Sequence, residues 1–144
     1  MKLPENQPCR KIVYDWVNKA NQDIRSAQIL LTQKPPLLYP ACFHAQQAAE
    51  KYLKTLLTWW HIEVPKTHEL GKLLKMIEVR DSDLAAKLLD VIVLNTYAVD
   101  IRYPGDQPEP SQAESHEALA LAIQVCDEIL PLLPLDSTKP EQIG

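Results

Sequence analysis

The placement of proline constrains this chain more than any other feature of its sequence. Twelve of the 144 residues are prolines, and most of them gather between long segments that contain none. A proline inside a helix removes a backbone hydrogen bond and clashes with the preceding turn, so such groups mark helix ends. We therefore expect helices between the prolines, which lie at residues 4–8, 35–40, 65, 104–110 and 131–140.

Each segment between the prolines has apolar residues at intervals of three and four, the spacing of one helix face. Thr67 is a suitable N-cap for a short third helix, and Ser111 with Glu114 three residues later forms a capping-box pattern. The five expected helices run from Arg10 or Asp15 to Gln33, from about Pro40 to His61, from just after Thr67 over a short stretch, from about Ser82 to Arg102, and from Ser111 to about Leu130.

Composition supports an all-helical protein. The chain has only three glycines, too few for the turns of a typical β protein, and its 46% apolar and 24% charged residues are ordinary for a globular chain. Short connections between long helices favour an antiparallel up-and-down bundle of four long helices plus one short helix. We expect one domain over residues 1–144, with a frayed tail after residue 134.

Charge, cysteine content and hydropathy exclude several functions. A net charge of −4 argues against a sequence-blind grip on long nucleic acid. The three separated cysteines, Cys9, Cys42 and Cys126, and the scattered histidines form no metal-binding spacing. Three glycines cannot build a phosphate-cradling loop, so we expect no bound cofactor beyond a possible nucleotide ligand. No run of 18 apolar residues or signal-peptide pattern is present, which predicts a cytoplasmic protein with no membrane contact.

The expected fourth helix is apolar on nearly all sides, which predicts that it lies at the centre of the bundle or is covered by a partner subunit. Asn95 and Arg102 interrupt its apolar face two turns apart, and Asp23 lies at the edge of the apolar face of the first helix. A buried guanidinium needs a partner, so we predict that these three side chains form one polar cluster. The cluster is either a satisfied ion pair, with Arg102 reaching to solvent, or a binding site suited to phosphate.

The second helix divides into two faces. Its alanines and leucines form an inward face, whereas His44, Gln47 and Lys51 fall opposite, with Phe43 among them. The polar face is interpreted either as solvated or as a surface for a dimer or a ligand. His68, at the start of the third helix, is typical of a local structural residue but remains a candidate for ligand contact.

The segments "CFHAQQAAEKYLKTLL", "KTHEL" and "RYPG", in this order and spacing, resemble the HEPN domain, named for higher eukaryotes and prokaryotes nucleotide-binding. The upstream "ANQDIRSAQILL" is similar to the first helix of that family, with Asp23 at an acidic position. The resemblance covers about residues 14–130. It implies a bundle of four or five helices, commonly a homodimer, and a small nucleotidyltransferase encoded nearby as a partner, in many cases within a toxin–antitoxin pair.

Other members of the family are metal-independent ribonucleases that carry an arginine, then four to six intervening residues, then a histidine. Here Arg102 is followed at those positions by Gln107, Pro108 and Glu109, and the next histidine is His116. Because the reaction needs an imidazole near the arginine, the "RYPG" sequence resembles a branch that binds rather than cleaves. We therefore expect no catalytic residue and no metal ligand.

Three hypotheses follow. The first is a non-catalytic module that binds a nucleotide, an RNA end or a nucleotidyltransferase. The second is a ribonuclease toxin that uses Arg102 with a displaced histidine. The third is a purely structural oligomerisation bundle. The candidate ligand-binding residues are Asp23, Asn95, Arg102, Tyr103, His44, Gln47, Lys51 and His68.

Overall fold

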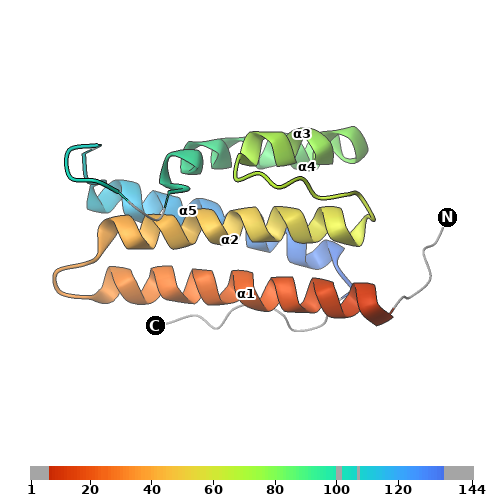
Figure 1. The fold of residues 1–144 in the computed structure, drawn as a ribbon, viewed down its shortest axis with the longest axis horizontal. Helices are drawn as coiled ribbons and strands as arrows, with labels where there is room; N and C mark the ends of the chain where they lie inside the picture. Colours follow the sequence, from red (N-terminus) through yellow and green to blue (C-terminus); the bar gives the residue numbers. More distant parts are fainter. Residues whose placement is uncertain (1–6, 100–101, 107, 135–144) are drawn as a thin grey trace.

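Within residues 7–99, 102–106 and 108–134, which the computed structural model describes, the chain is helical and contains no strand. The predicted all-α bundle is therefore confirmed (Figure 1). The predicted frayed tail after residue 134 lies outside the described residues. The elements are α1 (Gln7–Thr32), α2 (Leu38–Trp59), α3 (Leu70–Arg80), α4 (Ser82–Lys87), the 3-10 helix η1 (Leu89–Tyr97), α5 (Gln112–Ile129) and the 3-10 helix η2 (Leu130–Leu132).

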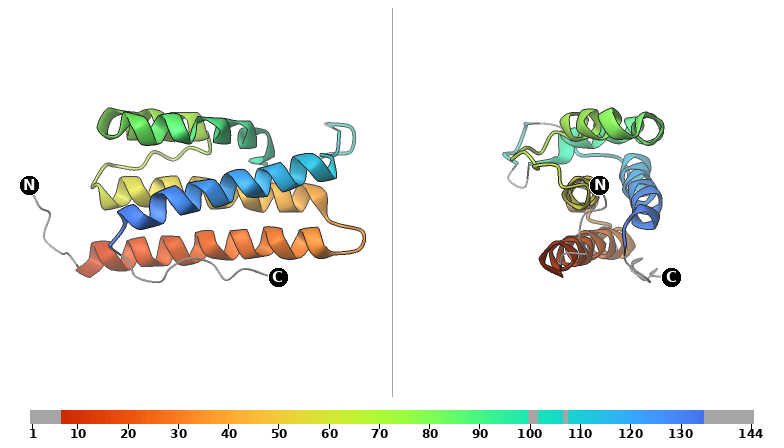
Figure 2. Two further views of the ribbon diagram at one scale, coloured as in Figure 1. Left: turned by 180° about the vertical axis from the view of Figure 1, so that it is seen from behind. Right: turned by 90° about the vertical axis from the view of Figure 1, so that its right-hand side faces the viewer.

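Helix α2 is the centre of the bundle. It packs against α1, α3, η1 and α5, and the end-on view in Figure 2 places it between α1 on one side and the layer of α3, α4 and η1 on the other. Helices α1 and α2 run antiparallel, and α5 crosses behind them (Figures 1 and 2). The fourth segment was predicted to lie at the centre of the bundle or under a partner subunit. The central position is wrong, because α2 occupies it.

Small side chains explain how α2 accommodates so many neighbours. Its alanines Ala41, Ala45, Ala48 and Ala49 are at most 1% exposed, and a short side chain lets a second backbone approach closely. Larger apolar residues fill the remaining space, and burial of each one stabilises the fold by about 1.5–3 kcal/mol. The fully buried ones on α2 are Tyr52, Leu53, Leu56 and Leu57.

The fourth segment differs most from its prediction. Instead of one long α-helix, it forms the short α4 and then the 3-10 helix η1, which ends at Tyr97, before Arg102. The buried residues Leu88, Val91 and Leu94 recur every third position, and residues three apart lie on one line in a 3-10 helix. Asn95 and Arg102 therefore do not share one helix face.

Helix starts follow local side-chain chemistry. The predicted capping box at α5 is confirmed: the Ser111 hydroxyl accepts from the Glu114 N–H, and the Glu114 carboxylate accepts from the Ser111 N–H. The predicted N-cap role of Thr67 is wrong, because Glu69 occupies the N-cap position of α3 and the Thr67 hydroxyl accepts from the Glu69 N–H, at 3.1 Å, before the helix begins. None of the described helices is both long and apolar enough to cross a membrane.

Candidate ligand-binding face

The face of α2 beside α1 contains the first of two charged clusters. Asp23, on α1, is 8% exposed and is bracketed by two residues of α2. Its carboxylate oxygens lie 2.8 Å from Nδ1 of His44 and 2.5 Å from Nζ of Lys51. An isolated buried carboxylate is costly, so these two contacts allow Asp23 to stay charged inside the helix pair.

The contact with Asp23 also determines what His44 can offer to a ligand. An ionised carboxylate only accepts hydrogen bonds, so Nδ1 of His44 must donate the proton. The neutral ring then has its acceptor at Nε2, and the side chain is about one-third exposed. His44 is thus an oriented imidazole at the surface rather than a freely rotating side chain.

A second cluster surrounds Glu50, the residue before Lys51 on α2. Its carboxylate accepts from Lys54 at 3.0 Å and Gln46 at 3.1 Å, and lies 3.0 Å from Nδ1 of His68. Burial on its own would raise the pKa of Glu50, but the hydrogen bonds from Lys54, Gln46 and His68 outweigh it and hold that pKa below its usual value. Glu50 therefore remains a carboxylate although it is only 5% exposed.

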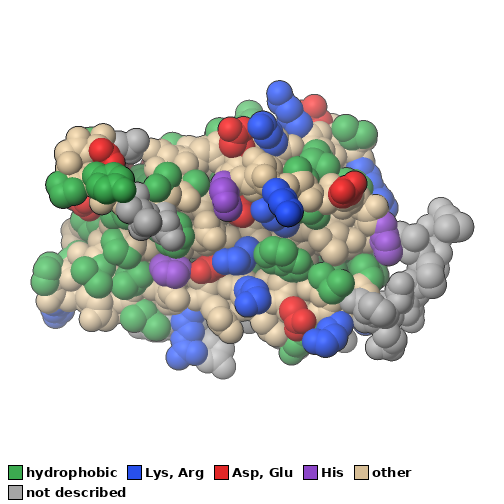
Figure 3. Space-filling model, in the orientation of Figure 1, with side chains coloured by type: hydrophobic (Ala, Val, Ile, Leu, Met, Phe, Trp, Pro, Cys, Tyr) green, Lys and Arg blue, Asp and Glu red, His purple; other side chains and the backbone are tan. Residues whose placement is uncertain are grey.

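Two amides extend the second cluster along α2. Nε2 of Gln47 donates to Oε1 of Gln46 at 2.7 Å, and Gln46 also reaches the carbonyl of His68 at 3.4 Å. Histidine, acidic and lysine side chains consequently lie next to one another over α1, α2 and α3 on the face shown in Figure 3. We call this row, composed of Asp23, His44, Gln46, Gln47, Glu50, Lys51, Lys54 and His68, the polar row.

Aromatic side chains extend the same side of α2 toward its first turn. Phe43 packs edge-on against His44, with ring centroids 5.5 Å apart. The guanidinium of Arg102 lies 4.1 Å from the ring centroid of Tyr39, one turn before Phe43, a cation–π geometry. Arg102 also contacts Glu109 at 3.1 Å. The helix therefore offers rings and cationic groups side by side.

The predicted cluster of Asp23, Asn95 and Arg102 does not form. Asp23 binds His44 and Lys51 instead, and Oδ1 of Asn95 accepts from the N–H of Leu70 at 2.9 Å. The reason is the 3-10 course of η1, which directs Asn95 toward the start of α3 and ends before Arg102.

Of the other predicted ligand-binding residues, all but Tyr103 belong to the polar row. His44, Gln47, Lys51 and His68 all belong to the polar row, as does Asp23. Tyr103 is 71% exposed in the loop after η1 and does not join the row by any recorded contact. Its N–H is held by the Asp106 carboxylate.

Sequence reasoning missed the residues of the second cluster, namely Gln46, Glu50 and Lys54. The available signal is that Glu50 and Lys54 stand at i and i+4, and that all three fall next to buried alanines rather than on the outer face. In the described part of the chain, no group of three or more His, Cys, Asp or Glu side chains is arranged to hold a metal ion.

Residues 13–132 match the sequence profile of the HEPN domain. The chain belongs to the HEPN family. A HEPN domain is a helical module of the nucleotide-binding and ribonuclease type, so the polar row of this HEPN protein is its candidate ligand-binding face.

Two solved structures support this assignment. The protein TT1696 from Thermus thermophilus is 29% identical, with a TM-score of 0.63 over 84% of this chain and 98% of its own. ST0689, described as an archaeal HEPN homologue, is 25% identical, with a TM-score of 0.66 over 83% of this chain and 96% of its own. No curated protein matches the sequence significantly.

Proposed function

We propose that this HEPN domain is a non-catalytic module that binds a nucleotide on the α2 face. The supporting observation is the adjacency, on one side of α2, of Phe43, the oriented imidazole of His44 and the ammonium group of Lys51. A nucleotide needs a flat apolar group for its base and cations or N–H donors for its phosphates. Phe43 provides the flat apolar group and Lys51 the cation, about two turns apart on one helix.

Each group has a distinct role in this proposal. The ring of Phe43 provides a surface for stacking a base. Lys51 contacts a phosphate oxygen, the Nε2 acceptor of His44 receives a hydrogen bond from a ribose hydroxyl, and Asp23 holds both side chains in position without touching the ligand. In this proposal Arg102, which lies beside Tyr39, contacts a second phosphate or the ribose.

Calorimetric titration with ATP and GTP tests the proposal, with adenosine as the control that lacks phosphates. Replacing Lys51 with Met should weaken ATP binding at least tenfold, since a hydrogen bond to a charged group contributes about 1.5–3 kcal/mol and about 1.4 kcal/mol corresponds to a factor of ten. Lys75→Met, which removes the same charge from an exposed position on α3, should leave the affinity unchanged. Circular dichroism confirms that both variants are folded.

The absence of heat with every nucleotide, together with an unchanged melting temperature, would remove the support for a nucleotide site. Equal weakening by Lys51→Met and Lys75→Met would mean that overall charge, and not this face, attracts the ligand. If variants of the polar row stay folded and no nucleotide binds to the wild-type protein or the variants, the structural oligomerisation bundle is favoured instead.

One observation favours a ribonuclease as the second candidate: His44 is oriented by a buried carboxylate, as a general base requires. In that reaction Nε2 of His44 accepts the proton of a 2′-hydroxyl, and the oxygen attacks phosphorus. The bond to the 5′-oxygen breaks, and that oxygen takes the proton that His44 has accepted, which restores the neutral imidazole. Arg102 stabilises the charge on phosphorus.

This candidate predicts that the protein cleaves tRNA in the presence of EDTA and leaves 2′,3′-cyclic phosphate ends. Arg102→Ala and His44→Asn should each abolish cleavage, whereas His116→Asn should not. Intact tRNA after prolonged incubation with wild-type protein would exclude it.

We also propose that the domain forms a homodimer in the cytoplasm and works with a small nucleotidyltransferase encoded nearby, as part of a toxin–antitoxin type system. The support is the family resemblance of the second-helix block and "RYPG". Sedimentation of the pure protein tests the homodimer, and co-purification with the product of the neighbouring gene tests the partner. Monomeric protein and purification without that product would count against both.

A further inference from the structure

The helix η1 exposes apolar side chains that the bundle does not use. Leu89 and Val93 are each 57% exposed, and Ile92 is 36% exposed. With three residues per 3-10 turn, the buried residues Leu88, Val91 and Leu94 fall on one line, and Leu89 and Ile92 fall on a second line that faces α3, where Ile92 packs beside Gly71. Val93 lies on a third line, which is exposed beside α5. A cluster of exposed branched apolar residues marks an interaction surface more often than a single one does.

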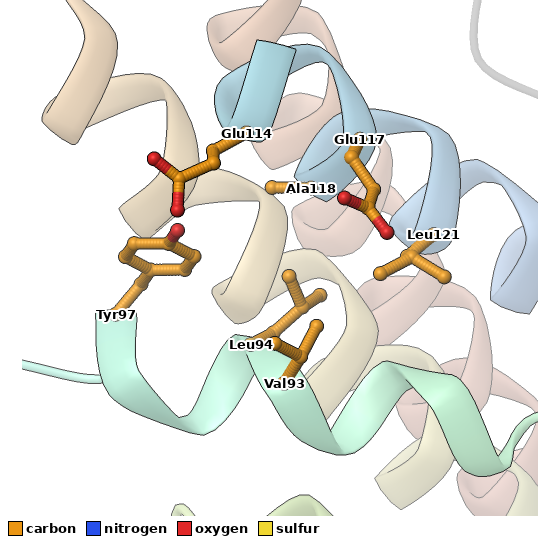
Figure 4. A pocket seen from close by; sticks show the side chains of 7 residues that line it. All are labelled: Val93, Leu94, Tyr97, Glu114, Glu117, Ala118 and Leu121. Atoms are coloured by element: carbon orange, nitrogen blue, oxygen red, sulfur yellow. The ribbon is translucent and has the colours of Figure 1, made fainter. Parts of the chain in front are cut away.

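A small pocket lies between η1 and α5, directly beside this exposed line. Figure 4 shows Val93, Leu94 and Tyr97 on η1 opposite Ala118 and Leu121 on α5, which give the pocket an apolar part beside its carboxylates. Burial first, then the nearby Cys42 and Glu114, raise the pKa of Tyr97 to about 12. Tyr97 therefore stays neutral near pH 7, and the pocket can receive an apolar side chain without facing a phenolate.

Carboxylates surround this pocket. Glu114 and Glu117 line it, and Asp90 and Val93 are one 3-10 turn apart on the same line of η1. Helix α5 carries four acidic residues and no Lys or Arg. Over residues 81–134 the chain has ten Asp and Glu but only two Lys and Arg, whereas residues 7–80 have six acidic and eleven basic residues.

We propose that the pocket and exposed side chains between η1 and α5 form a docking surface for a basic amphipathic segment of another protein. An apolar side chain of that segment enters the pocket beside Val93 and Leu121, and flanking Lys or Arg side chains contact Glu114, Glu117 and Asp90. Complementary charge around an apolar centre is the usual arrangement of a specific interface.

The charge argues for a different protein rather than a second copy joined through the same face. A two-fold contact would bring the carboxylates of both copies together, and like charges in contact are costly. The surface is also separate from the polar row, because α5 lies behind α2 in the view of Figure 1 and faces the reader in the left view of Figure 2. Its occupant therefore need not compete with a nucleotide.

Fluorescence anisotropy with labelled synthetic helices tests this proposal. The probe is a 14-residue helix with Leu on one face and Lys on the other, and the control probe has Glu in place of Lys. The full chain should bind the Leu/Lys probe and not the Leu/Glu probe, and rising salt should weaken binding because surface charges are screened over about 10 Å at 0.1 M.

Matched variants locate the binding. Val93→Asn and Glu117→Lys should each weaken binding at least fivefold. Val79→Asn makes the same change at a valine on α3 that is 89% exposed, and Glu78→Lys makes the same charge change on α3. Neither control should alter the affinity.

Three results would overturn the proposal. One is no binding of the Leu/Lys probe by the folded wild-type chain. Another is equal weakening by Glu117→Lys and Glu78→Lys, which would indicate attraction by net charge alone. The third is self-association in sedimentation that Val93→Asn abolishes, which would make a second copy the occupant of this surface.

Discussion

At the scale of single residues, the unusual feature is two carboxylates kept charged inside a helical bundle. Asp23 and Glu50 are both at least nine-tenths buried, and each is contacted by one histidine and one lysine. Replacing a buried ion pair with two well-packed apolar side chains often leaves the free energy of unfolding unchanged or raises it. The charges are therefore best explained by what they hold in place at the surface, namely the imidazoles of His44 and His68.

Glu50 makes stability depend on pH in acid. Its folded pKa is lowered, so the unfolded chain takes up a proton first as the pH falls. The stabilisation is complete above the unfolded pKa of about 4.5 and is lost as the pH falls through the lower folded value. Urea unfolding between neutral pH and acid should show this loss, and Glu50→Gln should have a flatter profile. Parallel profiles for the two proteins would contradict the assignment.

At the scale of elements, a side chain of η1 caps the start of α3. Asn95 lies on η1, and its Oδ1 accepts a hydrogen bond from the N–H of Leu70, the first residue of α3. The N-cap residue of α3, Glu69, makes no side-chain capping hydrogen bond. The side chain predicted as a ligand contact is thus a cap supplied from a neighbouring element.

The cap can be tested with two substitutions of Asn95. Asn95→Ala should lower the free energy of unfolding by about 1 kcal/mol, the usual cost of losing a cap. Asn95→Asp keeps an acceptor and places negative charge at a helix N-terminus, so it should retain most of the stability. Thermal unfolding of the three proteins measures the order. Equal losses in both variants would show that Asn95 acts through the amide N–H₂ group instead.

The same element shows where sequence reasoning succeeded and failed. The ends of α1, α2 and α5 were predictable because prolines and the Ser111 capping box act locally. The turn from α4 to η1 was missed because Leu88, Val91 and Leu94 fit both a helical stripe and a 3-10 period. His44 and Lys51 were identified as candidates, but their pairing with Asp23 depends on how α1 crosses α2, which no local pattern encodes.

At the scale of the whole molecule, charge is divided rather than mixed. The segment that forms α1, α2 and α3 is basic, and the segment that forms α4, η1 and α5 is acidic. The net charge of −4 therefore combines a basic N-terminal segment with an acidic C-terminal segment, and the two meet where α3 packs against α4 and η1. A small anion and a basic protein segment can each find a complementary surface on one molecule.

This division predicts how the protein behaves on charged resins. At about pH 7 and low salt, it should bind an anion exchanger and also be retained on heparin, because the anion exchanger attracts the acidic segment and heparin attracts the basic segment. Lys72→Gln with Lys75→Gln should lower the salt needed for elution from heparin. Lys87→Gln, on α4, should not. Flow-through of wild-type protein on heparin would show that the basic segment is too weak to act alone.

The central position of α2 has a consequence for the motions of the protein. Since α2 touches α1, α3, η1 and α5, its amides can be exposed only when the whole bundle opens, so they should exchange with deuterium at the rate of global unfolding. The amides of η1, with three exposed apolar side chains and weaker 3-10 hydrogen bonds, should exchange through local opening. The oriented imidazole of His44 thus stands on the slowest-exchanging helix, whereas the proposed docking surface lies on one that can adapt to its partner.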